Sequence, residues 1–312
     1  MRKYKGEIGL LVVAMIWGSG FIGSVIGLGY MTPYEALTGR FLVASLLLNI
    51  IFFRRILKLS RKTLMRGFII GFFLYVAFLL QTLGLELTTP SKNAFLTAVN
   101  VVVVPLLGFL ILKNRLNRKD IAGAILALAG VGIISLDPTG AINLGDLLSF
   151  LCAIAFAYHI FYTGQYSSEE SAIDLTLVQM NTAFLFSLAV MLVRGETLLG
   201  KAGGGYAAIL YLGVFSTTLA FFMQTFSQKS TTNTRAAIIM STEALFATVF
   251  SILVFKETIT LKMVLGSVVI FSAVLLPLLP DRKAEGMAGE NGLTDRAPEV
   301  FPTSLEGEQE AI

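Results

Sequence analysis

Few ionisable side chains interrupt the long apolar runs of this 312-residue sequence, and those few are the first candidates for chemistry. Glu243 is the eighth residue of the apolar run 236–255, a depth of about 12 Å if the run is helical. A carboxylate at such a depth must pair, face water or take up a proton. Its position therefore predicts that it binds a substrate amine or a coupling proton, with a hydrogen bond between helices as the structural alternative.

The other candidates for lining a cavity are polar or aromatic residues within apolar runs: Trp17, Tyr75, Gln81, Asn100, His159 and Gln224. Asn100 can hydrogen-bond a substrate or join two helices. His159 can relay protons near neutral pH, or stay neutral and hydrogen-bonded. Trp17 lies in the middle of its run, whereas tryptophan usually anchors at a membrane interface. We expect it either to form a cavity wall or to pack against lipid and other helices.

Three cations are candidates for gating or coupling, together with Glu243. Arg40 lies within an apolar run and could bind substrate, reach a carboxylate or extend to the membrane interface. Lys92 and Arg235 begin two apolar runs that should start on opposite membrane faces. A cation at a helix N-terminus opposes the helix dipole. Each could therefore attract an anionic group to its own gate, or simply extend into the interface.

Several kinds of chemistry are excluded by what the sequence lacks. It has no GxxxxGK[ST], HExxH or GxSxG motif, and it has one cysteine and one histidine. We therefore expect no catalytic residues, no metal site, no cofactor and no enzymatic activity. The net charge of +4 does not indicate nucleic-acid binding, because the basic residues fall between apolar runs.

The elements that must position these residues are membrane-spanning helices. Hydrophobic residues make up 55% of the chain and charged residues 14%, and the mean hydropathy is +0.78. Lipid cannot satisfy backbone polar groups, so long apolar runs must be helical. The sequence predicts an all-α integral membrane fold with ten helices, within 8–34, 36–53, 67–85, 93–112, 121–136, 147–168, 175–193, 202–228, 236–255 and 263–280.

Lysine and arginine in short loops predict the orientation. The segments 2–5, 54–66 and 113–119 are rich in both residues, whereas Lys92 is the only cation in the first half predicted on the opposite side. The N-terminus is therefore expected in the cytosol, and ten helices return the C-terminus there. The last segment, 281–312, holds acidic residues with scattered glycine and proline, and we expect a disordered acidic cytosolic tail.

The two halves of the sequence also resemble each other. A shift of 143 residues brings Gln81-Thr82 onto Gln224-Thr225, Lys92 onto Arg235 and Asn100 onto Glu243; a shift of 139 brings Trp17 onto Phe156 and Arg40 onto Gln179. Five helices per repeat place the second copy upside down, which is an architecture of transporters. We therefore expect two inverted five-helix repeats at 1–140 and 141–280.

These features resemble the EamA-type branch of the drug/metabolite transporter superfamily over residues 6–280. The resemblance rests on Trp17-Gly18, Arg40-Phe41, Leu116 through Gly132, Glu243, Phe255-Lys256-Glu257-Thr258 and Gly266. It implies ten helices, cytosolic termini and the transport of small metabolites such as amino acids, often outward. Asn114 departs from its counterpart Glu257, and Ala244 stands where the family often has a proline that would kink the helix.

The expected function is a secondary transporter, exporter or facilitator that works by alternating access in the cell inner membrane. Its two five-helix halves would rock around a central cavity. The expected partners are a small-molecule substrate and the lipid bilayer, with no nucleic acid, and the chain is expected to be a monomer. The alternatives are a transporter of phosphorylated metabolites, a membrane enzyme that acts on lipid, and a membrane scaffold or sensor.

Overall fold

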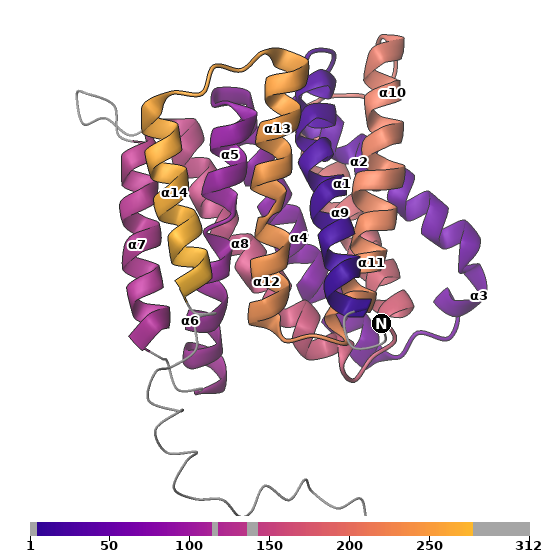
Figure 1. Cartoon of the computed structure of the whole chain (residues 1–312). Coiled ribbons are helices and arrows are strands. Elements are labelled where there is room, and N and C mark those ends of the chain that lie inside the picture. Colours follow the sequence, from indigo (N-terminus) through magenta and orange to yellow (C-terminus); the bar gives the residue numbers. More distant parts are fainter. Residues whose placement is uncertain (1–4, 114–117, 136–142, 277–312) are drawn as a thin grey trace, which may run out of the picture. The chain divides into compact units, whose positions relative to one another are not determined.

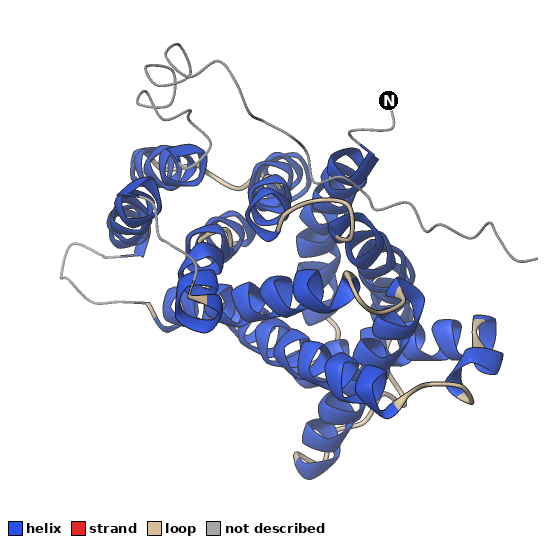
Figure 2. Ribbon diagram, turned by 90° about the horizontal axis from the view of Figure 1, so that it is seen from below, coloured by secondary structure: helices blue, strands red, loops and turns tan. Residues whose placement is uncertain are grey.

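The computed structural model describes residues 5–113, 118–135 and 143–276, and every regular element within these ranges is a helix (Figure 1, Figure 2). The predicted tail 281–312, Asn114 and part of the 113–119 loop lie outside the described residues. Eight helices are long and apolar enough to cross a membrane, and Ile121–Ile134 and Leu261–Ala273 are shorter apolar helices. The chain is therefore a multi-pass membrane protein.

The described helices are α1 (Lys5–Leu28), α2 (Pro33–Ile51), α3 (Phe53–Ile56), α4 (Arg61–Leu87), α5 (Pro90–Thr97), α6 (Asn100–Leu112), α7 (Arg118–Ser135), α8 (Leu144–Ser167), α9 (Ala172–Val193), α10 (Gly203–Tyr211), the π-helix η2 (Leu212–Leu219), α11 (Ala220–Gln228), α12 (Asn233–Ser241), α13 (Glu243–Phe255) and α14 (Leu261–Leu275). We call the end at which α1 begins the lower end and the opposite end the upper end, as drawn in Figure 1.

Hydroxyl side chains fix where several of these helices begin. Thr32 caps α2 through the Glu35 amide, and the Glu35 carboxylate accepts a hydrogen bond from the Thr32 amide in return. Thr89 and Thr232 cap α5 and α12 in the same manner through the amide three residues later. Such caps satisfy N–H groups that have no partner within the helix. They hold the short loops in place, which fixes the register of the helices that follow.

Two apolar runs expected to form single helices are each divided at their middle. Ala98 and Val99 separate α5 from α6, and Thr242 separates α12 from α13. The Thr242 amide donates to the Ile239 carbonyl three residues back, which is the tighter 3₁₀ pattern. The interruption before α13 exists although Ala244 replaces the usual proline. The first residue after each break is polar, Asn100 in α6 and Glu243 in α13.

A third long run, 202–228, contains a wider turn. Its central part is the π-helix η2, between α10 and α11. Within η2 the Thr218 hydroxyl donates to the Gly213 carbonyl, 2.7 Å away, five residues back. Such irregular turns inside helices frequently occur at functional sites.

The two sequence halves interlock. The helix α4 packs most extensively against α8 and α9, α1 packs against α10–α13, and α7 packs against α14. Glycines allow several of these close contacts: a Cβ on Gly18 in α1 would meet Phe246 Cβ and lie 2.9 Å from the Ala247 amide nitrogen in α13. Contacts between helices of the first half are fewer. The two sequence halves therefore pack against each other and do not form separate packed bodies.

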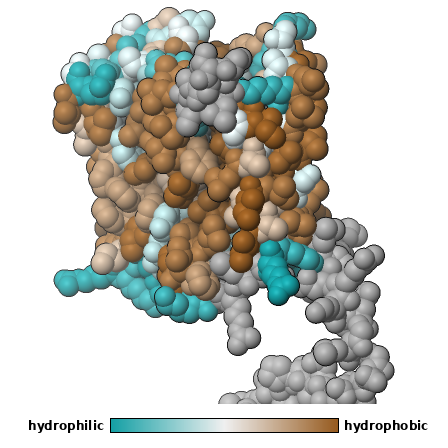
Figure 3. Space-filling view, turned by 90° about the vertical axis from the view of Figure 1, so that its left-hand side faces the viewer, coloured by the Kyte–Doolittle hydropathy of each residue, from teal (hydrophilic) through white to brown (hydrophobic). Residues whose placement is uncertain are grey.

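The surface has the distribution of polarity that a membrane requires. Apolar side chains cover a broad band, and hydrophilic side chains gather toward both ends (Figure 3). At the lower end Lys62 pairs with Glu169, and Arg66 pairs with Glu169 and Glu170. At the upper end Lys201 pairs with Glu35. These ion pairs join loops and helix ends of the two halves outside the apolar band.

Candidate functional site

Six of the predicted site residues line one cavity inside the helix bundle. They come from α1, α2, α4, α6, α11 and α13 in this order: Trp17, Arg40, Gln81, Asn100, Gln224 and Glu243. The centre of a water molecule can occupy about 30 Å³ of this cavity. The cavity is thus narrow in this conformation, and a metabolite would need the surrounding helices to separate.

Arg40 is buried, with 3% of its surface exposed. Its Nε donates to Thr217 Oγ1 at 3.0 Å and its Nη2 donates to Ser216 Oγ at 3.3 Å. The guanidinium carbon lies 4.1 Å from the centre of the Phe78 ring. No carboxylate of the described residues lies within ion-pair distance of it. Arg40 therefore does not extend to the membrane interface, and its charge is available to the cavity.

Glu243 begins α13 directly after the helix break, and 7% of its surface is exposed. Its carboxyl group forms neither a hydrogen bond nor an ion pair with any described residue. Asn100 Oδ1 and both amide atoms of Gln224 are likewise buried without a partner in the described part of the chain. Buried polar groups normally have partners, so these three side chains are available to a ligand.

Trp17 forms one wall of the cavity. Its indole Nε1 donates to the Ser216 carbonyl in η2, 3.0 Å away. Its ring centre lies 4.9 Å from that of Phe221, and Phe78 packs against Phe221 in turn. The indole is thereby fixed between polar and aromatic groups and does not face lipid as an interfacial anchor would.

Two predicted residues lie outside the cavity lining. His159 is fully buried, and its Nε2 is 2.9 Å from Gln179 Oε1. Gln179 also donates to the Thr225 hydroxyl, so the histidine belongs to a small network behind the cavity wall. The ring of Tyr75 stacks on Phe186, and its hydroxyl has no partner among the described residues.

The two predicted gate cations are also outside the cavity. Lys92 Nζ lies 2.6 Å from Asp146 Oδ2, and the Thr88 hydroxyl donates to Asp146 Oδ1. Asp146 is buried, so this cluster ties α5 to the start of α8 at the upper end. Arg235 is exposed at the lower end.

Sequence reasoning did not find Ser216, Thr217 and Phe78, which surround the Arg40 guanidinium. Hydroxyl and phenyl side chains are common in apolar helices and give no signal alone. The run Ser216-Thr217-Thr218 in the middle of an apolar segment was the available hint.

The sequence profile of the EamA-like transporter family matches residues 4–136 and again residues 143–279. The chain belongs to the EamA-like transporter family. An uncharacterized transporter of Archaeoglobus fulgidus is 31% identical over 276 residues, which cover 88% of this chain and 86% of that protein. The uncharacterized transporter YyaM of Bacillus subtilis is 24% identical over 233 residues, 71% of this chain and 76% of its own. The resemblance in the sequence is confirmed, and the chain is a membrane transporter.

A solved crystal structure shares the fold of this EamA-family chain. It superposes with a TM-score of 0.66 at 15% identity and covers 88% of this chain and 97% of that one. At this identity the likeness concerns the fold alone.

Proposed function

We propose that this EamA-family protein is a secondary transporter of small metabolites such as amino acids, and that the central cavity is its substrate site. One observation carries the proposal. Four pairs of residues that correspond under the sequence shifts line the same cavity: Trp17 with Phe156, Phe21 with Ile160, Gln81 with Gln224, and Asn100 with Glu243. A cavity built twice over from the two repeats is the expected location of a substrate site in inverted-repeat transporters.

The helix bounds support two inverted five-helix repeats, residues 1–140 and 141–280, with α7 and α14 as the fifth helix of each. The bounds of α1 and α8 differ by 139 residues at both ends, and those of α6 and α13 differ by 143. The same shift of 143 relates Lys113 and Lys256, whose backbones adopt φ of 59° and 56°. This left-handed conformation is uncommon outside glycine, so its recurrence at the end of α6 and α13 favours a duplicated unit.

We infer that alternating access moves two mixed bundles rather than the two sequence halves. One bundle consists of α1 with α10–α13, and the other consists of α8 with α4–α6, because these helices pack closely across the halves. Separating them at one end would widen the narrow cavity toward that side, while the contacts inside each bundle persist.

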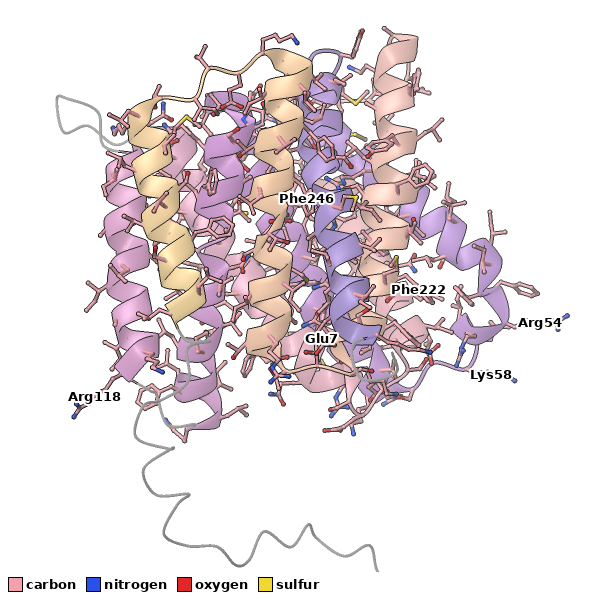
Figure 4. All side chains as sticks on the ribbon, viewed as in Figure 1. Glu7, Arg54, Lys58, Arg118, Phe222 and Phe246 are labelled. Atoms are coloured by element: carbon pink, nitrogen blue, oxygen red, sulfur yellow. The ribbon has the colours of Figure 1, made fainter. Side chains whose placement is uncertain are left out.

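The proposed orientation has the lower end in the cytosol of the inner membrane. Lysine and arginine concentrate at this end, where Arg54, Lys58 and Arg118 extend outward (Figure 4). The positive-inside rule then places the N-terminus there, and ten crossings return the C-terminus to the same side. One chain encloses the cavity, so we propose that the monomer is the working unit.

A transporter of phosphorylated metabolites is the second candidate, and the cavity disfavours it. A phosphate monoester carries a charge of about −1.5 to −2 at pH 7, which a single cation does not balance. Of the three candidate cations only Arg40 lines the cavity; Lys92 pairs with Asp146 and Arg235 is exposed at the lower end.

The test is uptake by purified protein in liposomes, with a pool of amino acids and other metabolites, in the presence and absence of a pH gradient. We expect accumulation that follows the gradient in the wild type and is abolished in Glu243→Gln. Glu86→Gln is the matched control, because Glu86 is exposed at the end of α4. Equal accumulation in Glu243→Gln would exclude proton coupling at this residue. No transport of any pooled compound by folded protein would overturn the proposed function.

A further inference from the structure

The charge of Arg40 is not neutralised within the described structure. Its guanidinium is buried, and the groups around it are two hydroxyls and a phenyl ring. Removing a charge from water costs several kcal/mol unless a counter-charge compensates it. The face of an aromatic ring and hydroxyl oxygens offset part of this cost but carry no net charge. An anion in the cavity would supply the missing counter-charge.

The π-helix η2 determines where this charge is held. Ser216 and Thr217 are consecutive residues, yet both hydroxyls accept hydrogen bonds from Arg40. The altered hydrogen-bond pattern of η2 is itself supported from two sides: the Thr218 hydroxyl donates to the Gly213 carbonyl, and the Trp17 indole donates to the Ser216 carbonyl. These two hydrogen bonds stabilise η2, which in turn holds the guanidinium against the cavity wall.

The remaining hydrogen-bonding capacity of Arg40 suits a carboxylate. A guanidinium has five N–H donors in a planar fork, and two of them are bonded to Ser216 and Thr217. The other three have no hydrogen-bond partner among the described residues, and the side chain lines the cavity. A planar fork binds a carboxylate through two parallel hydrogen bonds, which an ammonium group cannot do.

We propose that Arg40 anchors a single carboxylate of the transported molecule, and that Ser216 and Thr217 are positioning residues that hold the guanidinium for it. The proposal rests on the proposed function, since it assigns one subsite within the same cavity. The carboxylate would lie near Phe78, with Asn100, Gln224 and Glu243 left to contact the rest of the molecule.

The protein contains an intrinsic fluorophore with which the carboxylate anchor can be tested. Trp17 is the only tryptophan of the chain, and it lines the cavity with its indole bonded to the same η2 segment. A change in its fluorescence therefore reports occupancy of the site in purified full-length protein. Three probes share one apolar chain: leucine has both charged groups, isocaproate has only the carboxylate, and isopentylamine has only the amine.

We expect leucine and isocaproate to change the Trp17 signal, and isopentylamine to bind at least about tenfold more weakly. Arg40→Gln should abolish isocaproate binding, and Arg40→Lys should weaken it, because an ammonium lacks the fork. The pair Ser216→Ala with Thr217→Val should weaken isocaproate binding about tenfold. The pair Ser216→Thr with Thr217→Ser keeps both hydroxyls and should restore the affinity for isocaproate. If all these variants unfold at the same temperature as the wild type, a merely structural role would not predict this loss and recovery of affinity.

The control is Ser272→Ala on α14, an exposed hydroxyl that donates only to a carbonyl of its own helix. Isopentylamine binding equal to that of leucine, or unchanged isocaproate binding in Arg40→Gln, would overturn the carboxylate anchor. If none of the three compounds changed the Trp17 fluorescence, the carboxylate anchor would also be overturned. If folded protein still transports a pooled compound in liposomes, only the anchor has failed; if it transports none, the proposed function has failed as well.

Discussion

At the scale of single residues, the cavity holds several side chains whose polar atoms are buried without partners among the described residues. Outside the cavity, Asn93 Nδ2 donates to Ser149 although its Oδ1 has no partner among the described residues, and the half-buried Asn181 and Asn49 bond each other between α9 and α2. In the cavity, Asn100 Oδ1 and the Gln224 amide have none among the described residues. An unpaired buried polar group lowers stability by about 1–3 kcal/mol. Such groups are costly to the fold, which favours a role in binding.

Gln224→Leu should therefore separate function from stability. Replacing an unpartnered amide with an apolar side chain should leave the unfolding temperature unchanged or raise it, while uptake falls at least about tenfold. Asn93→Leu is the contrasting variant, because it breaks the bond to Ser149 and should lower stability by about 1–3 kcal/mol. Unfolding can be followed by the reaction of a fluorogenic dye with Cys152, the single and buried cysteine. A lower unfolding temperature in Gln224→Leu would show that the amide is structural.

Glu169 gives a prediction about pH. Hydrogen bonds from Arg66 and then Lys62 lower the pKa of the Glu169 carboxyl below its usual value. A carboxyl whose pKa is lower in the folded state stabilises the fold above its unfolded pKa, and this contribution is lost as the pH falls through the folded value. The unfolding temperature of Glu169→Gln should thus fall less than that of the wild type between about pH 6 and about pH 3. Parallel curves, with Glu86→Gln as control, would contradict this.

The sequence predicted part of the site for a clear reason. Trp17, Asn100 and Glu243 interrupt apolar runs, and such interruptions in a membrane helix usually face the protein interior. The sequence could not show that His159 lies outside the cavity lining, because its hydrogen-bond partner Gln179 lies on another helix. The same limit applies to Lys92, whose ion pair with Asp146 requires knowledge of how α5 meets α8.

At the scale of elements, glycines set the spacing of helices across the halves. The close approach of α1 to α13 depends on Gly18, which faces Phe246 and the backbone of Ala247; Phe246 is labelled in Figure 4. Helix positions were predictable because each span must fill the membrane thickness. The breaks before Asn100 and Glu243 were not, because no proline or glycine marks them, and neither was the π-helix, which depends on tertiary partners such as Trp17.

Gly18→Val should force α1 away from α13. The added side chain would collide with Phe246 and with the backbone of α13, and overpacking of this kind typically lowers stability by about 1–3 kcal/mol. Because α13 carries Glu243, transport should fall as well. Gly203→Ala is the control, since a Cβ there meets nothing within 4 Å. Equal unfolding temperatures for the two variants would show that this contact can relax freely.

At the scale of the whole molecule, the packing across the halves decides what can move. If α1 travels with α10, a covalent link between them should not stop transport. The Cβ position of Gly27 lies 3.5 Å from Ala208 Cβ, which suits a disulfide. Gly27→Cys with Ala208→Cys, in a Cys152→Ala background, should therefore retain uptake after oxidation. Arrest of transport by oxidation, reversed by a reductant, would support rocking of the sequence halves instead.

The interlocking of the halves also has a consequence for biosynthesis. The first helix, α1, packs chiefly against α10–α13, whose residues are made about 200 positions later. At about 5–20 residues per second, α1 remains in the membrane for on the order of 10–40 s before these partners emerge from the ribosome. During this time its glycine face contacts lipid or the insertion machinery. The first half is therefore not a completed intermediate, and a substitution in α13 can expose α1 to quality-control proteases although the first half is unchanged.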